Sequence, residues 1–367
     1  MHYHLILTEK CNLQCKYCYG KSMDEENDLN QKFKFCFNSP LKTSVKTCDL
    51  KKFLAKDKNS YLIFYGGEPL LEIPKITELM DSIDVPYRMQ TNGLLLHKVP
   101  KEYMNRIGKI LVSVDGNKQR TDFNRGKGVF DRVIKNINLI RENGYKGEIL
   151  ARMTISPEFP DIYGQVLFLL DSGFDSIHWQ LDAEFYKCDF NFDKFSEFVK
   201  EYNSYVSRLA DYWLEEIKKG RVIKIYPFLG IIDSLLKNEK TKLRCGAGYS
   251  GYAIDTKGDV VACPIMNGIE DFRAGTIKDS PDDLKKFEIS GKCSKCKDLD
   301  LCGGRCLYSN RTELWPIEGQ ELVCITIRHL INEMKKILPE VSSLIDKGVV
   351  KKGDFEYEKY FGPEIIP

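Results

Sequence analysis

The sequence predicts an α/β protein in which a partial, TIM-like (β/α)6 barrel of parallel strands precedes a small cysteine-rich domain and C-terminal helices. Two observations predict this class. Short runs with strand character alternate with helical patterns through the first 225 residues, which is typical of βαβ units and a parallel sheet. The rhythm then changes, and cysteines gather between residues 245 and 324. In such barrels, functional residues lie at the carboxyl ends of the strands.

Six short runs of apolar, aromatic and β-branched residues have the length and composition of buried strands. They cover residues 3–8, 61–65, 87–91, 110–114, 149–155 and 176–181. Between the later strands, residues 130–143 place their apolar side chains on one helical face, and Gly144 stands where a C-cap would. The alternation therefore predicts strands joined by helices.

The chain after residue 225 has a different pattern. Residues 249–263 predict a β-hairpin with its turn at 255–259, and the stretch 291–324 has little periodicity. Residues 325–347 predict a helix that Pro339 interrupts, because proline lacks the backbone N–H that a helix interior uses.

These patterns predict three regions along the chain. A barrel covers residues 1–225, a cysteine-rich domain with a β-hairpin covers 226–330, and a helical tail covers 331–367. Segment 20–48 is polar, lacks a clear period and receives no assignment.

The composition is that of a globular protein, with 43% apolar and 29% charged residues. A formal net charge of +2 does not favour nucleic acid or an anionic membrane as a partner. No apolar run is long enough to span a bilayer, and the N-terminus lacks a basic region followed by an apolar stretch. We therefore expect a cytoplasmic location, in which the 13 cysteines stay reduced and metal binding is the better explanation of their clustering.

The first cysteine group follows the first strand directly. Cys11, Cys15 and Cys18 form Cys-x3-Cys-x2-Cys, and three thiolates on a short loop can hold three irons of a [4Fe–4S] cluster. The fourth iron then remains free to bind a small molecule. Zinc is the alternative, although structural zinc sites have four ligands and usually Cys-x2-4-Cys pairs. The spacing favours the cluster.

This motif, with Tyr17 just before its third cysteine, resembles the signature of the radical S-adenosylmethionine (SAM) superfamily. Gly66-Gly67-Glu68-Pro69, after the second strand, resembles the family's GGE motif, which holds the amino group of the methionyl moiety. The resemblance implies a radical SAM barrel with a SAM-binding [4Fe–4S] cluster at Cys11, Cys15 and Cys18.

The same resemblance places further residues at the cofactor. Arg152 is expected to pair with the SAM carboxylate, since a guanidinium grips a carboxylate with two hydrogen bonds. The sequence departs from the family at Thr121-Asp122, where His-Asp is common. The implied cofactor-binding residues are Tyr17, Gly66, Gly67, Glu68, Asn92, Ser113, Asp115, Arg125 and Arg152.

The second cysteine group resembles the seven-cysteine pattern of the SPASM extension, which occurs in radical enzymes that mature peptides and proteins. The resemblance implies two auxiliary [4Fe–4S] clusters, hence three clusters in all. One would be held by Cys293, Cys296, Cys302 and Cys324, and the other by Cys245, Cys263 and Cys306. The fourth position of the latter is either open or closed by Cys188. A zinc ribbon is the alternative, because Cys-x2-Cys can also hold zinc.

The resemblance implies an enzyme that cleaves SAM to a 5′-deoxyadenosyl radical and abstracts hydrogen from a peptide or protein side chain. The outcome would be a thioether or carbon–carbon crosslink, or an oxidised residue, with the auxiliary clusters accepting an electron or binding substrate. Gln180 and Asp182, near a later strand end, are candidate catalytic residues. The alternatives are the same chemistry on a small molecule, as in a dehydrogenation, and a non-catalytic iron–sulfur electron carrier.

The implied partners are a peptide or protein substrate and a low-potential electron donor such as ferredoxin or flavodoxin. Because the sequence begins at its first barrel strand, a leader peptide would be read by a separate leader-peptide-binding protein or by segment 20–48. In relatives that mature sulfatases, an Asp that serves as base directly follows the second auxiliary cysteine. Pro264 follows Cys263 here, which argues against that activity.

Overall fold

The computed structural model describes residues 1–19, 32–182, 190–362 and 364–367. These residues form two compact units, and each is assembled from two separate stretches of sequence. The first unit contains residues 1–150 and 246–288, and the second contains residues 151–245 and 289–367. The expected boundaries at residues 225 and 330 remain predictions.

Parallel strands form the centre of the first unit. Strand β1 (His2–Ile6) pairs in parallel with β2 (Tyr61–Tyr65), β2 with β3 (Tyr87–Thr91), and β3 with β4 (Ile107–Ser113). All but two residues of β1 and β2 are buried, as expected for strands that are covered on both faces. The predicted parallel α/β fold is confirmed here, with strand bounds within a few residues of those expected.

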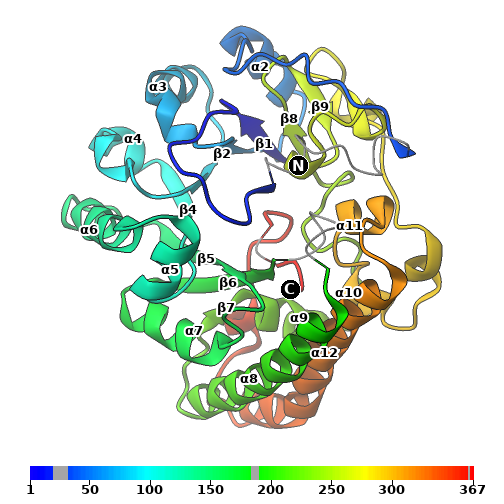
Figure 1. Cartoon of the computed structure of the whole chain (residues 1–367). Coiled ribbons are helices and arrows are strands. Elements are labelled where there is room, and N and C mark those ends of the chain that lie inside the picture. Colours follow the sequence, from blue (N-terminus) through cyan, green and yellow to red (C-terminus); the bar gives the residue numbers. More distant parts are fainter. Residues whose placement is uncertain (20–31, 183–189, 363) are drawn as a thin grey trace. The chain divides into compact units, whose positions relative to one another are not determined.

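Helices connect these strands and lie on their outer side (Figure 1). In α6, the side chains of Val129, Val133, Ile137 and Ile140 are buried at three- and four-residue spacing, so the predicted helical face is confirmed. The helix before it is capped by Asn117, whose side chain accepts a hydrogen bond from the Arg120 N–H. The helices of this unit are α2 (Thr47–Leu54), α3 (Ile73–Ser82), α4 (Lys101–Met104), α5 (Lys118–Arg125) and α6 (Val129–Glu142).

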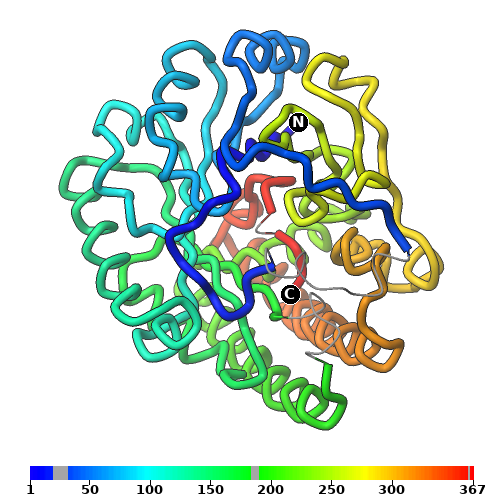
Figure 2. The backbone as a smooth tube through the Cα atoms, turned by 45° about the horizontal axis from the view of Figure 1, so that its top comes forward, coloured from blue at the N-terminus to red at the C-terminus, as the bar shows by residue number. Residues whose placement is uncertain are grey.

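The other stretch of the first unit extends the same sheet. Strand β8 (Gly251–Ile254) pairs in parallel with β1 and antiparallel with β9 (Asp259–Val261), which pairs in turn with β10 (Arg273–Thr276). The tube in Figure 2 shows this late segment beside the N-terminal strand. The predicted hairpin is confirmed, and the Asp255 carboxylate closes its turn by accepting from the N–H groups of Lys257, Gly258 and Asp259.

The second unit combines short strands with long helices. Strand β6 (Ser176–Leu181) pairs in parallel with β7 (Lys224–Ile225), and β5 (Glu148–Ile155) crosses the point at which the chain passes between units. Helices α8 and α12 pack side by side (Figure 1). The helices of this unit are α7 (Ile162–Asp171), α8 (Phe192–Lys218), α9 (Tyr226–Lys237), α10 (Leu299–Cys302), α11 (Leu307–Thr312) and α12 (Ile317–Asp346).

Helix α12 differs from its expectation in two ways. It begins eight residues earlier than predicted, and Pro339 lies inside it without ending it. The Pro339 side chain is exposed, whereas Ile337, Val341 and Leu344 on the other face are buried. The carbonyl that loses its helical partner can therefore be hydrated, while the buried face keeps the helix in place.

Short 3-10 turns complete the described chain, and no described helix has the length and apolarity that crossing a membrane requires. The turns are Pro69–Glu72, Leu96–Lys98, Pro264–Met266, Glu270–Phe272, Pro281–Asp283, Gly291–Lys295 and Lys352–Phe355.

Candidate cofactor site

Three cysteines of the first unit lie on the loop that follows β1. Cys11 is exposed, and Cys15 and Cys18 are partly exposed. The loop is tied to α5, because the Lys16 N–H donates to the Asn124 carbonyl at 2.9 Å. Burial raises the pKa of the Cys11 and Cys15 thiols, and both thiols interact electrostatically with Cys18. The three thiols are therefore close enough to influence one another electrostatically.

The Gly66-Gly67 pair brings the loop after β2 into direct backbone contact with the cysteine loop. A Cβ atom at Gly66 would lie 2.4 Å from the Thr8 carbonyl oxygen, and one at Gly67 would lie 2.4 Å from the Lys10 carbonyl oxygen. Gly66 also has a φ of +142°, which favours glycine. The Gly67 N–H donates to the Thr8 carbonyl at 2.8 Å. Only glycine permits this approach, which fixes the course of the cysteine loop.

Glu68 links this loop to the end of β3. Its carboxylate is fully buried and accepts hydrogen bonds from the Leu70 N–H (3.0 Å), the Thr91 hydroxyl (2.7 Å) and the Asn92 N–H (2.8 Å). Burial raises the pKa of Glu68 to about 7, although these three donors lower it in part. The carboxylate therefore fixes the relative positions of two strand-end loops.

Asp115, after β4, holds the buried side chain of Arg125 and the partly exposed side chain of Tyr17. The Arg125 guanidinium donates to both carboxylate oxygens at 2.9 Å, and the Tyr17 hydroxyl donates to Oδ2 at 2.5 Å. The guanidinium also lies over the Tyr17 ring, at 5.3 Å from its centroid. Burial opposes the charge of Arg125, but Asp115 outweighs it and raises the pKa of the guanidinium. Asp115 therefore holds a cation beside Cys15, with which Arg125 interacts.

The remaining predicted residues of this unit lie at the same strand ends. Asn92, after β3, is 7% exposed, and its side chain contacts Asn12 and Cys11. Ser113 is partly exposed at the last position of β4. The structure thus brings together all the predicted cofactor residues of the first unit, from the ends of four parallel strands.

Three predicted residues belong to the second unit. Arg152 on β5 donates to the Gln180 Oε1 atom at 2.8 Å, so these two side chains form a pair. Asp182 follows β6, and its N–H donates to the Ile155 carbonyl at 2.7 Å. All three side chains are partly exposed.

The auxiliary cysteines are divided between the units. In the second unit, Cys293, Cys302, Cys306 and Cys324 line one cavity, and burial raises the pKa of the Cys302 thiol to about 11. Cys296 accepts a hydrogen bond from the Arg328 guanidinium, which also interacts with Cys324. The four cysteines of the first predicted auxiliary set thus lie in one neighbourhood.

The other auxiliary set is not brought together within one unit. Cys245 and Cys306 belong to the second unit and Cys263 to the first, while Cys188 lies outside the described residues. Within the described part of the chain, no three His, Cys, Asp or Glu side chains converge tightly enough to hold a single metal ion. A cubane is wider than one ion, and its ligands stand correspondingly farther apart.

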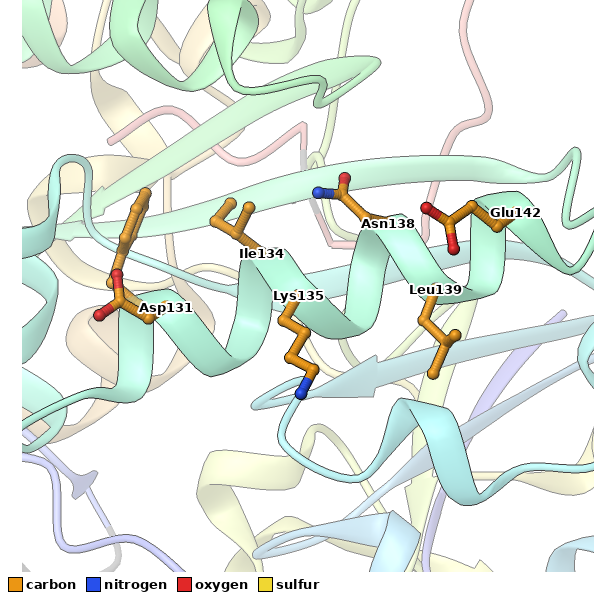
Figure 3. Close-up of a pocket in the computed structure, with 7 residues that line it drawn as sticks. Asp131, Ile134, Lys135, Asn138, Leu139 and Glu142 are labelled. Atoms are coloured by element: carbon orange, nitrogen blue, oxygen red, sulfur yellow. The ribbon is translucent and has the colours of Figure 1, made fainter.

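Several contacting residues were not identified from the sequence. Asn12 and Asn124 support the cysteine loop through hydrogen bonds, and no spacing rule indicates them. Arg328 had a usable signal, because it lies four residues after Cys324 in a helical pattern. A surface hollow along α6, lined by Asp131, Ile134 and Leu139 among others, contains none of the predicted site residues (Figure 3).

The protein has a parallel α/β fold, and the loop after β1 carries three thiols. These thiols are suited to bind three irons of a [4Fe–4S] cluster, which leaves the fourth iron without a protein ligand. Three thiols share one loop, glycines allow the neighbouring loop to approach, and Arg125 offsets negative charge beside Cys15. Residues 5–169 match the family model described as the radical SAM superfamily. The chain therefore contains a radical SAM domain over these residues and is a radical SAM enzyme.

Relatives and solved structures extend the likeness beyond this segment. A cysteine-type anaerobic sulfatase-maturating enzyme from Clostridium novyi is 24% identical and matches over 82% of this chain and 85% of its own. The radical SAM cyclopropyl synthase TigE from Paramaledivibacter caminithermalis is 25% identical over 91% of this chain and 74% of its own. The structure of native anSMEcpe with bound AdoMet and the Cp18Cys peptide has a TM-score of 0.69 at 18% identity. The structural match covers 93% of this chain and 99% of the anSMEcpe chain, so the two proteins share a fold over nearly their whole length.

Proposed function

We propose that this radical SAM enzyme modifies a side chain of a peptide or protein. The observation that carries the proposal is the cysteine loop after β1, with glycines and a buried carboxylate bracing it from the neighbouring strand ends. The relatives support the class of substrate, since their names describe a sulfatase-maturating enzyme and a cyclopropyl synthase, and the similar solved structure contains a bound peptide.

Cys11, Cys15 and Cys18 would hold the cluster, and SAM would bind beside it. When bound and reduced by one electron, the cluster supplies the electron that breaks the sulfonium C–S bond and generates the radical that removes a substrate hydrogen. Gly66 and Gly67 keep their loop in contact with the cysteine loop, and its backbone carbonyls would receive the SAM ammonium. Arg152, held by Gln180, would pair with the SAM carboxylate.

Asp115 would have a positioning role in addition to the cofactor contact that its motif implies. Its carboxylate is already bonded to Arg125 and Tyr17, so we assign it to holding these side chains in place. Ser113, at the end of β4, would contact the ribose or methionyl end of SAM, and Glu68 would brace the loop beneath the ammonium. The Gln180 amide would act through Arg152, and no catalytic step is assigned to Asp182.

We further propose two auxiliary clusters in the arrangement that the SPASM resemblance implies. The Cys293, Cys296, Cys302 and Cys324 set is supported by the cavity that three of them line together with Cys306 of the other set. The Cys245, Cys263 and Cys306 set would leave a position that is open or closed by Cys188. A low-potential ferredoxin or flavodoxin would supply electrons, and the modification would be a crosslink or an oxidation. Pro264, which starts a 3-10 turn after Cys263, disfavours sulfatase maturation.

The test is an anaerobic assay of the reconstituted full-length protein with dithionite and SAM. We expect 5′-deoxyadenosine to form in the wild type and to be absent in Cys15→Ala. Short peptides encoded beside the gene are then added, and mass spectrometry should detect a product that has lost hydrogen. Absence of 5′-deoxyadenosine from protein with a full iron complement, with or without these peptides, would contradict the proposal.

A further inference from the structure

The side chain of Asn92 lies between the loop after β3 and the cysteine loop. Its Nδ2 atom is 2.7 Å from Asn12 Oδ1 and 3.9 Å from Cys11 Sγ. Its Oδ1 atom accepts from the Leu94 N–H at 3.0 Å. The side chain is 7% exposed, so water does not compete freely for these contacts.

The surroundings determine which end of the amide faces the cysteine. The Leu94 N–H is a donor and must meet the amide oxygen, which places the NH2 group on the side of Asn12 and Cys11. One of its hydrogens is taken by Asn12 Oδ1, and the other remains for the Cys11 sulfur. The Asn92 backbone is fixed as well, because its N–H donates to the buried Glu68 carboxylate.

We propose that Asn92 acts through Cys11 as a positioning residue that raises the reduction potential of the cluster. The inference rests on the proposed function, because it requires a cluster bound at Cys11. One-electron reduction, with the electron supplied by dithionite or a low-potential protein, increases the negative charge on the thiolate sulfurs. An N–H···S hydrogen bond therefore stabilises the reduced form more than the oxidised form. Asn92 thereby makes the first electron easier to deliver.

Asn136, on α6, provides a matched control because its side chain contacts the same loop. Its Nδ2 atom donates to the carbonyls of Gly93 and Leu94 at 2.9 Å each, and the side chain is 6% exposed. It braces the loop that carries Asn92 but contacts no cysteine of the described residues. Replacing Asn136 therefore reports on loosening of the loop, whereas replacing Asn92 also removes the donor to sulfur.

The experiment is an anaerobic redox titration of reconstituted full-length protein, followed by electron paramagnetic resonance with and without SAM. The signal that changes on SAM addition identifies the cluster at Cys11. We expect its midpoint potential to be more negative in Asn92→Leu than in the wild type. Asn92→Asp should be more negative still, because it replaces the donor by a negative charge. Asn136→Leu should stay close to the wild type.

Equal midpoint potentials in the wild type and both Asn92 variants would overturn the inference. So would an equal shift in Asn136→Leu and Asn92→Leu, since loop loosening would then explain both. If the Asn92→Leu variant loses iron, the midpoint potential of Asn92→Asp is the test instead. The carboxylate that replaces the amide in that variant can still accept from the Leu94 N–H, so the loop keeps this contact. Absence of a SAM-responsive signal in the wild type would instead contradict the proposed function.

Discussion

At the scale of single residues, the site depends on buried charges that compensate one another. Asp115 is fully buried, and Arg125 is 8% exposed, so neither charge is well hydrated. Their two-pronged contact, with the Tyr17 hydroxyl as a third bond, replaces water as the source of stabilisation. Loss of one partner would leave the other charge unpaired in a poorly hydrated site.

We expect Asp115→Asn to destabilise the protein by about 3–5 kcal/mol, because it leaves the Arg125 guanidinium buried without a counter-charge. Urea-induced unfolding of the two proteins measures this difference. Asp131→Asn is the control, since it breaks the solvent-exposed ion pair with Lys118 and should change little. An Asp115→Asn variant as stable as the control would show that the pair does not hold the site together.

At the scale of elements, four parallel strands end at the same edge of the sheet, so the loops that follow them lie next to one another. The loops after β1 and β2 touch through backbone atoms, and the loops after β2 and β3 share the Glu68 carboxylate. Rigid strands therefore position the cysteines, even though the cysteines themselves lie on a loop.

Gly67→Ala tests this arrangement. Its Cβ atom would lie 2.4 Å from the Lys10 carbonyl oxygen, so the two loops must separate by roughly 1 Å, and misplacement on that scale can reduce activity on the order of 100-fold. We expect a loss of 5′-deoxyadenosine formation of that size in the reconstituted protein. Gly353→Ala is the control, because its Cβ atom meets nothing within 4 Å. Activity of Gly67→Ala equal to that of Gly353→Ala would refute the close-contact explanation.

At the scale of the whole molecule, two sets of cysteines have separate surroundings. The Cys11, Cys15 and Cys18 loop belongs to the first unit, and the Cys293, Cys296, Cys302 and Cys324 set belongs to the second. Each set has its own cation, Arg125 beside Cys15 and Arg328 beside Cys296. The sets should therefore load with iron independently.

Cys324→Ala and Cys15→Ala should each remove about four irons per protein, but from different sites. We expect Cys324→Ala to keep dithionite-driven cleavage of SAM, whereas Cys15→Ala loses it. Iron and sulfide analysis together with the 5′-deoxyadenosine assay measures both effects. Loss of all iron in either variant would show that the sites do not load independently.

Much of the fold could be predicted because strands and helices leave local periodic signals. The six strands and α6 were found within a few residues, since each pattern depends only on near neighbours. Helix α12 was predicted too short, and Pro339 was expected to interrupt it. The helix continues because packing of its buried face contributes more than the one backbone hydrogen bond that is lost at Pro339 on the exposed face.

The sequence by itself determined the cysteine spacing, the glycine pair and the order of motifs along parallel strands, because these are properties of the chain's covalent order. It did not determine that Asp115 holds Arg125 and Tyr17, or that Asn92 donates to Cys11, since 98 residues separate Tyr17 from Asp115 and 81 separate Cys11 from Asn92. Only tertiary structure decides such contacts, because each requires burial and fixed orientation of groups that sequence separation does not relate.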